Sequence, residues 1–231
     1  YSQVLPINFA TRNIAERHRW FSFQEVFLAL GLAPRSPGYI RLSLPPLLPE
    51  SRQVLSTRGL DLDAPYAVLH AGATKDYKKW PHAHFAALAT LLREQGLQVV
   101  FAGAGQDAHD TRQIMQLLDE GAGTRAIIDA TNLMSLADLG SFLQSATVMI
   151  GNDSGPFHLG CTVGTPGVVI FGPTEAALWR PLGAHVELLQ KRDMCSAQCS
   201  RKQCIHDHRC LTAITPEQLC AAVNAVLKTA Q

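Results

Sequence analysis

The stretch Gly151-Asn-Asp-Ser-Gly-Pro-Phe-His158 decides the fold, because it joins an apolar strand to an apolar helix. Residues 146–150 are typical of a buried strand, and the small apolar residues 159–163 predict a helix. Pro156 suits a first helical turn, and the two glycines let a ligand approach the backbone closely. Ligands of open α/β sheets bind where such strands end. The stretch therefore predicts a ligand site, in which the acceptor-only carboxylate of Asp153 suits sugar hydroxyls better than phosphates.

Strands and helices alternate along the chain from about residue 64 onward. Strands are predicted over residues 66–70, 97–102, 126–129, 147–151 and 168–171, and helices are predicted to begin near Pro81, Ala108, Ser135 and Thr215. Before this region, residues 20–30 have helical spacing and the proline-rich residues 33–49 suggest an extended connector. This alternation predicts an α/β fold with a Rossmann-like parallel sheet and helices on both faces.

Composition narrows the function classes. The chain has 231 residues, 47% of them hydrophobic and 17% charged, with a net charge of +1, which is typical of a globular protein. The near-neutral charge argues against a nucleic-acid partner. No apolar run approaches the roughly 20 residues that span a bilayer, and no signal-peptide pattern is present.

Four cysteines crowd into one polar segment, as Cys195, Cys199, Cys204 and Cys210. They could be free thiols, disulfides or a four-thiolate metal site. Their spacing, C-x3-C-x4-C-x5-C, lacks the paired C-x2-C knuckles of common zinc folds and favours unligated thiols or disulfides over a metal site. The other two cysteines lie in apolar helical stretches and are expected in the core.

The connection after the first predicted strand combines small residues with hydroxyl and ammonium groups. It contains Thr74, Lys75, Lys78 and Lys79 ahead of a helix start. Backbone donors, the helix dipole and the lysines together would bind a diphosphate. The alternative is a solvated basic loop.

Other candidate residues follow later strands. Asp107 follows a Gly-x-Gly turn and could bind ribose hydroxyls. Met134 could pack against a base, although core packing is more common for methionine. His158 lies one helical turn beyond Gly155 and could be a structural histidine instead. Asp61-Leu-Asp63 matches a metal-binding DxD pattern, but it precedes the first strand, so we expect it on the surface.

Four motifs in order resemble those of glycosyltransferase family 9, the lipopolysaccharide heptosyltransferases. They are the His70-x-Gly72 turn with Lys78-Lys-Trp-Pro81, then Met134-Ser-Leu136, Asn152-Asp-Ser-Gly155 with His158, and Phe171-Gly-Pro-Thr174. The resemblance covers essentially the whole chain.

The resemblance implies one half of a GT-B enzyme, the C-terminal domain that binds ADP-heptose. It places the diphosphate against Thr74 and Lys78, the ribose against Asp107 and adenine against Met134, and Lys75 is also expected among the donor-binding residues. It assigns the sugar–diphosphate turn to Asp153, Ser154, Gly155 and His158. Transfer in this family inverts the sugar and needs no metal. A related group that modifies autotransporter proteins uses a cysteine-bound iron, which keeps the metal alternative open.

One departure shapes the expectation for this chain. No aspartate precedes Asp61, whereas the family's catalytic aspartate lies in an N-terminal domain that binds the acceptor. We therefore expect residues 1–60 to be an interdomain segment with a remnant of the acceptor domain, and residues 61–231 to bind the nucleotide-sugar. The chain alone is expected to bind donor without transferring it.

The expected acceptor is the lipopolysaccharide core. The expected location is the cytoplasm, with peripheral contact at the inner membrane. Two alternatives are a GT-B UDP-sugar 2-epimerase and a non-catalytic nucleotide-sugar-binding module.

Overall fold

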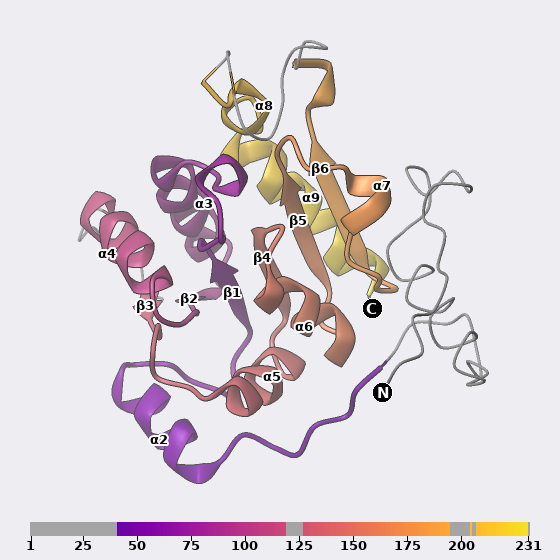
Figure 1. Cartoon of the computed structure of the whole chain (residues 1–231). Helices are drawn as coiled ribbons and strands as arrows, with labels where there is room; N and C mark the ends of the chain where they lie inside the picture. The colour runs from indigo at the N-terminus through magenta and orange to yellow at the C-terminus, as the bar shows by residue number, and fades with distance from the viewer. Residues whose placement is uncertain (1–40, 119–126, 195–203, 205–206, 231) are drawn as a thin grey trace, which may run out of the picture.

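The computed structural model describes residues 41–118, 127–194, 204 and 207–230 (Figure 1). Within these residues one six-stranded sheet has the order β3-β2-β1-β4-β5-β6, and every neighbouring pair is parallel. The strands are β1 (Tyr66–His70), β2 (Gln98–Phe101), β3 (Ile127–Asp129), β4 (Val148–Asn152), β5 (Gly167–Phe171) and β6 (Val186–Gln190). The predicted Rossmann-like α/β class is confirmed.

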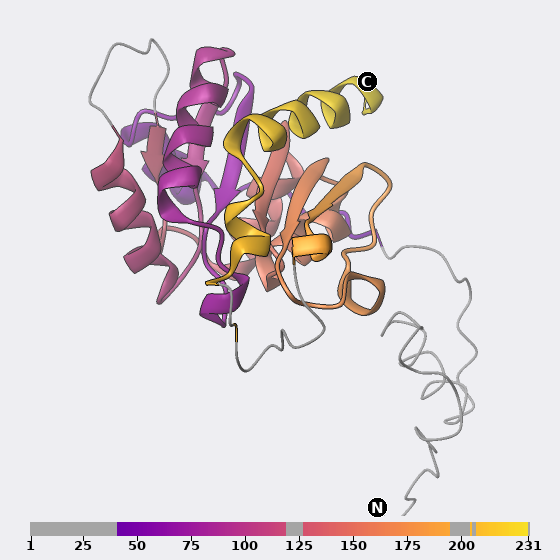
Figure 2. The ribbon, with the colours of Figure 1, turned by 90° about the horizontal axis from the view of Figure 1, so that it is seen from above.

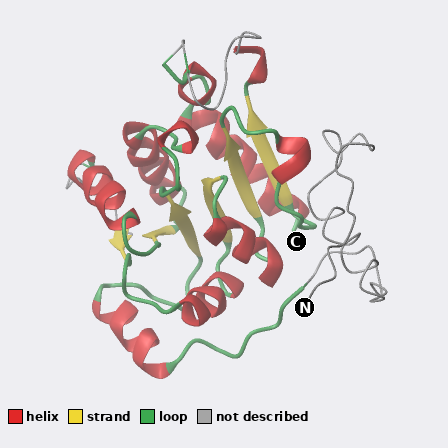
Figure 3. Ribbon diagram, in the orientation of Figure 1, coloured by secondary structure: helices red, strands yellow, loops and turns green. Residues whose placement is uncertain are grey.

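Helices cover both faces of this sheet (Figures 1, 2 and 3). They are α2 (Pro49–Thr57), α3 (His82–Glu94), α4 (Asp107–Leu117), α5 (Leu136–Gln144), α6 (Gly155–Val163), α7 (Ala176–Trp179), α8 (Arg209–Thr212) and α9 (Pro216–Thr229), with the 3-10 turns η2 (Asp76–Lys78) and η3 (Arg192–Met194). On one face α3 contacts α4 and α9, and on the other α5 contacts α6. Within the described ranges no helix combines the length and apolarity that a membrane crossing needs.

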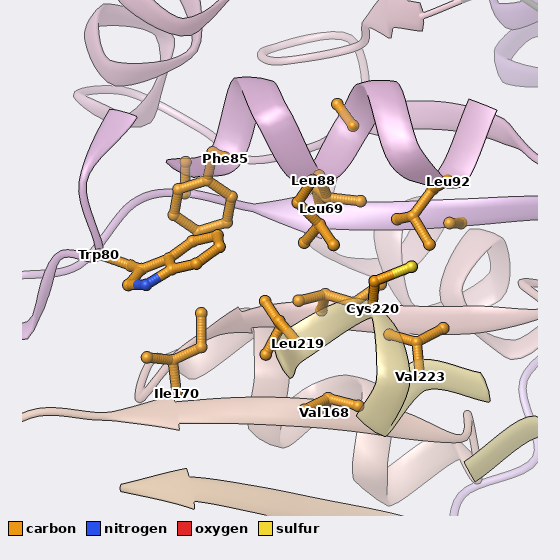
Figure 4. Close-up of a cluster of buried hydrophobic side chains, with 14 of the residues drawn as sticks. Leu69, Trp80, Phe85, Leu88, Leu92, Val168, Ile170, Leu219, Cys220 and Val223 are labelled. Carbon is orange, nitrogen blue, oxygen red and sulfur yellow. The ribbon is translucent and has the colours of Figure 1, made fainter. Parts of the chain in front are cut away.

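Trp80 anchors the core beneath α3 and α9 (Figure 4). Its ring is fully buried, lies edge-on to Phe85 at 5.0 Å between ring centroids, and donates its indole N–H to the Ile214 carbonyl at 2.9 Å. Leu69 from β1 and Ile170 from β5 belong to the same cluster. The residue just before the predicted helix therefore ties the β1–α3 connection to the core.

A second core lies on the opposite face, against α5 and α6. Tyr66 stacks on Phe142 with 4.9 Å between ring centroids and donates its hydroxyl to the Phe142 carbonyl at 2.8 Å. Burial raises the pKa of Tyr66, so this hydroxyl stays protonated. Phe157 of α6 is buried in the same cluster. A face-specific core on each side explains why strands β1, β4 and β5 are buried along their whole length.

Residues 41–60 pack against this second face. Leu55 of α2 is fully buried there. The exposed side chain of Gln144 accepts the Leu44 N–H at 2.9 Å and donates to the Leu44 carbonyl at 3.1 Å. Pro49 opens α2, although the sequence placed it in an extended connector, because proline suits a first helical turn. The division into residues 1–60 and 61–231 stays a prediction.

The five predicted strands occur within one residue of their predicted bounds, whereas α6 begins at Gly155, four residues before the predicted residues 159–163. Strand β4 is shifted one residue toward the C-terminus, and α4 begins one residue early, at Asp107. Strand β6 was not predicted, because its five residues are all half-buried at the sheet edge and form no apolar run. The predicted helix over residues 20–30 lies outside the described residues.

The strand order sets the position of the site. β1 and β4 are neighbours, and the helices that follow them, α3 and α6, pack on opposite faces. Their connections therefore diverge at the carboxyl end of the sheet. Open α/β sheets bind ligands in the crevice at such a switch point.

Candidate functional site

Asn152, the last residue of β4, braces the connection between β1 and α3. Its fully buried side chain accepts the Trp80 N–H at 3.0 Å and donates to the Ala71 carbonyl at 2.7 Å. One amide thus holds both ends of the connection that carries Lys78. Asn152 had no predicted role of its own, since bonds to both ends of a distant loop leave no periodic signal.

Asp153 lies between the side chains of Lys78 and His158. Lys78 Nζ is 2.6 Å from its Oδ2, and His158 Nε2 is 3.6 Å from its Oδ1. Only 6% of the Asp153 side chain is exposed. Burial opposes ionisation, but hydrogen bonds from His158 and Lys78 hold the pKa of Asp153 below its ordinary value. The structure thus brings together three predicted site residues, Lys78, Asp153 and His158. Asp153 is ionised, and the half-buried Lys78 is held in place by its bond to Asp153.

A second cluster links three loops through His70. His70 Nδ1 lies 3.0 Å from Ser154 Oγ, and His70 Nε2 lies 3.2 Å from Asp107 Oδ2. Asp107 also accepts the Ala104 N–H at 2.9 Å. Burial would raise the pKa of Asp107, but the hydrogen bonds from His70 and Ala104 lower it below its usual range. His70 thus links Asp107, the predicted ribose residue, to Ser154, a predicted residue of the sugar–diphosphate turn. His70 itself was predicted only as part of a turn motif.

Glycines make room for this second cluster. A Cβ on Gly72 would fall 1.8 Å from Asp107 Oδ1, and one on Gly103 would fall 2.7 Å from Asp107 Oδ2. A Cβ on Gly151 would fall 2.9 Å from the His70 carbonyl oxygen. Glycine at these positions therefore lets the Asp107 side chain and the His70 backbone approach the turns closely.

Lys79 has different partners from its neighbour Lys78. Its ammonium lies 3.1 Å from Asp110 Oδ2 and 3.2 Å from Asp76 Oδ1, and His82 Nε2 lies 3.0 Å from Asp110 Oδ1. Partial burial would lower the pKa of Lys79, but its bonds to Asp110 and Asp76 raise it. Lys79 therefore joins the start of α3 to α4 and points away from Asp153.

The remaining predicted donor residues lie around these clusters. Thr74 and Lys75 are exposed on the β1–α3 connection, and Gly155 is exposed at the start of α6. Met134, after β3, is half-buried against the second core. Among the described residues, the side chains of Thr74, Lys75 and Met134 form no hydrogen bond or ion pair with either cluster.

The Phe171–Thr174 turn at the end of β5 is held from β6. Gln190 donates from Nε2 to the carbonyls of Gly172 and Thr174, both at 2.8 Å. Gln190 was missed with its strand. The turn thus keeps its place on the carboxyl side of the sheet, where the other connections converge.

The two patterns that could suggest a metal site are the DxD segment at residues 61–63 and the crowded cysteines. Asp63 is exposed and pairs with Arg52 at 2.7 Å, as expected of a surface loop. Cys195 and Cys199 lie outside the described residues, whereas Cys204 accepts the His208 N–H at 3.1 Å and Cys210 is buried. In the described part of the chain, no group of three or more His, Cys, Asp or Glu side chains is placed to hold a metal ion.

Comparison with known proteins places this chain in a family. The family model described as glycosyltransferase family 9 (heptosyltransferase) matches residues 8–209. Lipooligosaccharide heptosyltransferase 2 of Haemophilus influenzae is 30% identical over 154 residues, which are 65% of this chain and 43% of that protein.

Solved structures show the same fold. The Escherichia coli ADP-heptose lps heptosyltransferase II matches with a TM-score of 0.71 and 23% identity, over 87% of this chain and 57% of that one. The iron-containing dodecameric glycosyltransferase TibC of enterotoxigenic E. coli matches with a TM-score of 0.58 and 19% identity, over 88% and 52%. The chain thus spans about half the length of these proteins.

Proposed function

This chain belongs to glycosyltransferase family 9, the heptosyltransferase family, and from that membership we propose that it binds the nucleotide-sugar donor ADP-heptose. The observation that carries the proposal is the Lys78–Asp153 pair at the switch point between β1 and β4. An ammonium group held at the diverging connections of a parallel sheet is suited to a diphosphate. The E. coli ADP-heptose lps heptosyltransferase II, which has the same fold, supports the choice of donor.

Each predicted residue has a place in this proposal. Lys78, with the exposed Thr74 and Lys75 beside it, binds the diphosphate. Asp107 binds the ribose hydroxyls, and Met134 lines the adenine pocket. The turn of Asp153, Ser154, Gly155 and His158 faces the junction of sugar and diphosphate. Asp153 supports this function by fixing the Lys78 ammonium at 2.6 Å.

The whole enzyme would transfer heptose to a hydroxyl of the lipopolysaccharide core. A base outside residues 61–231 would take the hydroxyl proton, and the sugar carbon would be inverted. Lys78 and the helix starts would stabilise the departing diphosphate, the role that a metal has in other transferases. Residues 61–231 would form the donor domain, with residues 1–60 leading to the acceptor domain. The enzyme would act in the cytoplasm, at the inner membrane surface.

Calorimetry with paired nucleotides tests the proposed donor. We expect the chain to bind ADP and ADP-heptose at least tenfold more tightly than UDP and UDP-sugars, because Met134 and its surroundings accommodate adenine. Equal affinity, or a preference for UDP, would contradict the donor assignment and favour an epimerase-like enzyme. A scan of unfolding temperature with each nucleotide provides an independent check, since a ligand that binds the folded state stabilises it.

Elemental analysis tests the metal-free expectation. We expect protein purified without chelator to contain no stoichiometric zinc or iron, because the spacing of the four crowded cysteines lacks paired knuckles. One metal ion per chain that is lost in Cys204→Ser would contradict this and show a thiolate site that couples to folding. Cys161→Ser serves as the control, because Cys161 is a core residue of α6.

A further inference from the structure

In the Ser154–His70–Asp107 chain of hydrogen bonds, the carboxylate end fixes the direction of one link, and with a neutral imidazole that link sets the direction of the other. The Asp107 carboxylate accepts from the Ala104 N–H and is ionised, so its Oδ2 must accept from His70 Nε2–H as well. A neutral imidazole with a proton on Nε2 has a bare Nδ1, and the partner of one ring nitrogen thus sets the role of the other. Ser154 must then donate its single hydroxyl proton to Nδ1 across 3.0 Å.

The helix that begins after Ser154 does not use the hydroxyl's lone pairs. Ser154 is the N-cap residue of α6, yet its side chain makes no capping hydrogen bond. Pro156 in the first turn lacks an N–H that a cap could accept. Ser154 is half-buried beside the exposed Gly155. Its oxygen therefore keeps two lone pairs and no proton for a group arriving from solvent.

We propose, on the basis of the proposed function, that His70 is a positioning residue. By accepting the Ser154 hydroxyl proton, it leaves Ser154 only as an acceptor for a hydroxyl of the donor sugar. Phosphate oxygens at neutral pH are acceptors and cannot donate to Ser154. The ribose hydroxyls are assigned to Asp107, at the other end of the chain of bonds. The sugar beyond the diphosphate is the remaining part of a nucleotide-sugar that carries hydroxyl donors. Ser154 thus distinguishes the full donor from its nucleotide product.

Binding measurements with two ligands test the ligand side of the proposal. Ser154→Ala is expected to weaken ADP-heptose binding roughly fivefold to tenfold, the size of one neutral hydrogen bond, and to change ADP binding less than about twofold. Ser154→Thr keeps the hydroxyl and should restore ADP-heptose binding. Ser145→Ala removes a hydroxyl at the far end of α5 and should change neither affinity. Equal losses for ADP and ADP-heptose in Ser154→Ala would overturn the assignment.

Nitrogen-15 NMR of the ligand-free chain tests the protein side. Long-range proton–nitrogen spectra at neutral pH should show His70 protonated on Nε2 and bare on Nδ1, a signature that a merely structural histidine need not have. Asp107→Ala should abolish this single tautomer. A proton on Nδ1, alone or together with Nε2, would overturn the proposal, because Ser154 would then accept from His70.

The two measurements separate this inference from the function on which it rests. If the wild type binds neither ADP nor ADP-heptose, the donor assignment fails and the role of Ser154 fails with it, whatever the tautomer. If it binds both but Ser154→Ala loses no selectivity, the donor assignment stands and this inference alone fails. His70→Ala should match Ser154→Ala in its selective loss. If that variant does not fold, the serine variant and the NMR signature decide.

Discussion

Replacing Asn152 with alanine is expected to destabilise the folded chain by about 2–6 kcal/mol, because two buried backbone groups lose their partner. The Trp80 N–H and the Ala71 carbonyl both bond to the Asn152 side chain, which is 0% exposed. Each unsatisfied buried group costs about 1–3 kcal/mol, since water does not replace the lost bond. Urea unfolding followed by circular dichroism measures the change.

Gln144→Ala is a matched control for this effect. The Gln144 side chain also makes two bonds to one loop, through the N–H and carbonyl of Leu44, but Gln144 is exposed. Water can replace both bonds, so we expect a change below about 1 kcal/mol. Similar losses in the two variants would show that burial of the Asn152 bonds is not what holds the connection. Asn152→Ala should also weaken ADP binding, because the same bonds position the segment carrying Lys78.

The strands were predictable wherever burial is continuous. β1, β4 and β5 are apolar runs enclosed on both faces, and short runs of this kind are visible in sequence. β6 is half-buried at an edge and includes Glu187 and Gln190, so its pairing with β5 decides its conformation. Such pairing depends on residues far apart in the chain and leaves no local pattern.

The site was predictable as a set of loops but not as a set of contacts. Motif positions placed Lys78, Asp107 and Asp153 in the connections that follow strands, and in the structure they follow β1, β2 and β4. Lys78 and Lys79 are adjacent and chemically identical, yet one pairs with Asp153 and the other with Asp110. The sequence does not decide between them, because the turn η2 and the buried Trp80 set the direction of each side chain.

Lys78→Met is expected to weaken ADP binding by about 1.5–3 kcal/mol, or roughly 10- to 150-fold, the scale of a hydrogen bond to a charged group. Methionine keeps an unbranched apolar side chain of similar length, so the change removes mainly the ammonium. Calorimetry at two salt concentrations measures the loss, and the wild-type affinity should fall more steeply with salt than that of the variant. An unchanged ADP affinity would show that Lys78 belongs to a solvated basic loop and does not bind the diphosphate.

Lys79→Met is the matched control, because the two lysines are neighbours with similar exposure, 22% for Lys78 and 25% for Lys79. Its loss leaves the buried Asp110 with His82 and should lower the free energy of unfolding. Affinity for ADP should change less than about threefold, since its ammonium faces Asp110 and Asp76. If Lys79→Met weakened ADP binding as much as Lys78→Met, any positive charge near the loop would support binding, and the specific position of the Lys78 ammonium would not matter.

A double variant separates the role of Lys78 in ADP binding from its role in neutralising the buried charge of Asp153. Lys78→Met leaves Asp153 buried beside His158 alone, which destabilises the chain because a buried carboxylate loses its main partner. Adding Asp153→Asn removes that unpaired charge and should recover much of the lost stability. ADP affinity should nevertheless stay low, because the ammonium that meets the diphosphate is still missing. Recovery of affinity in the double variant would show that Lys78 serves only to neutralise Asp153, and the diphosphate would then have to be bound by other residues of these connections.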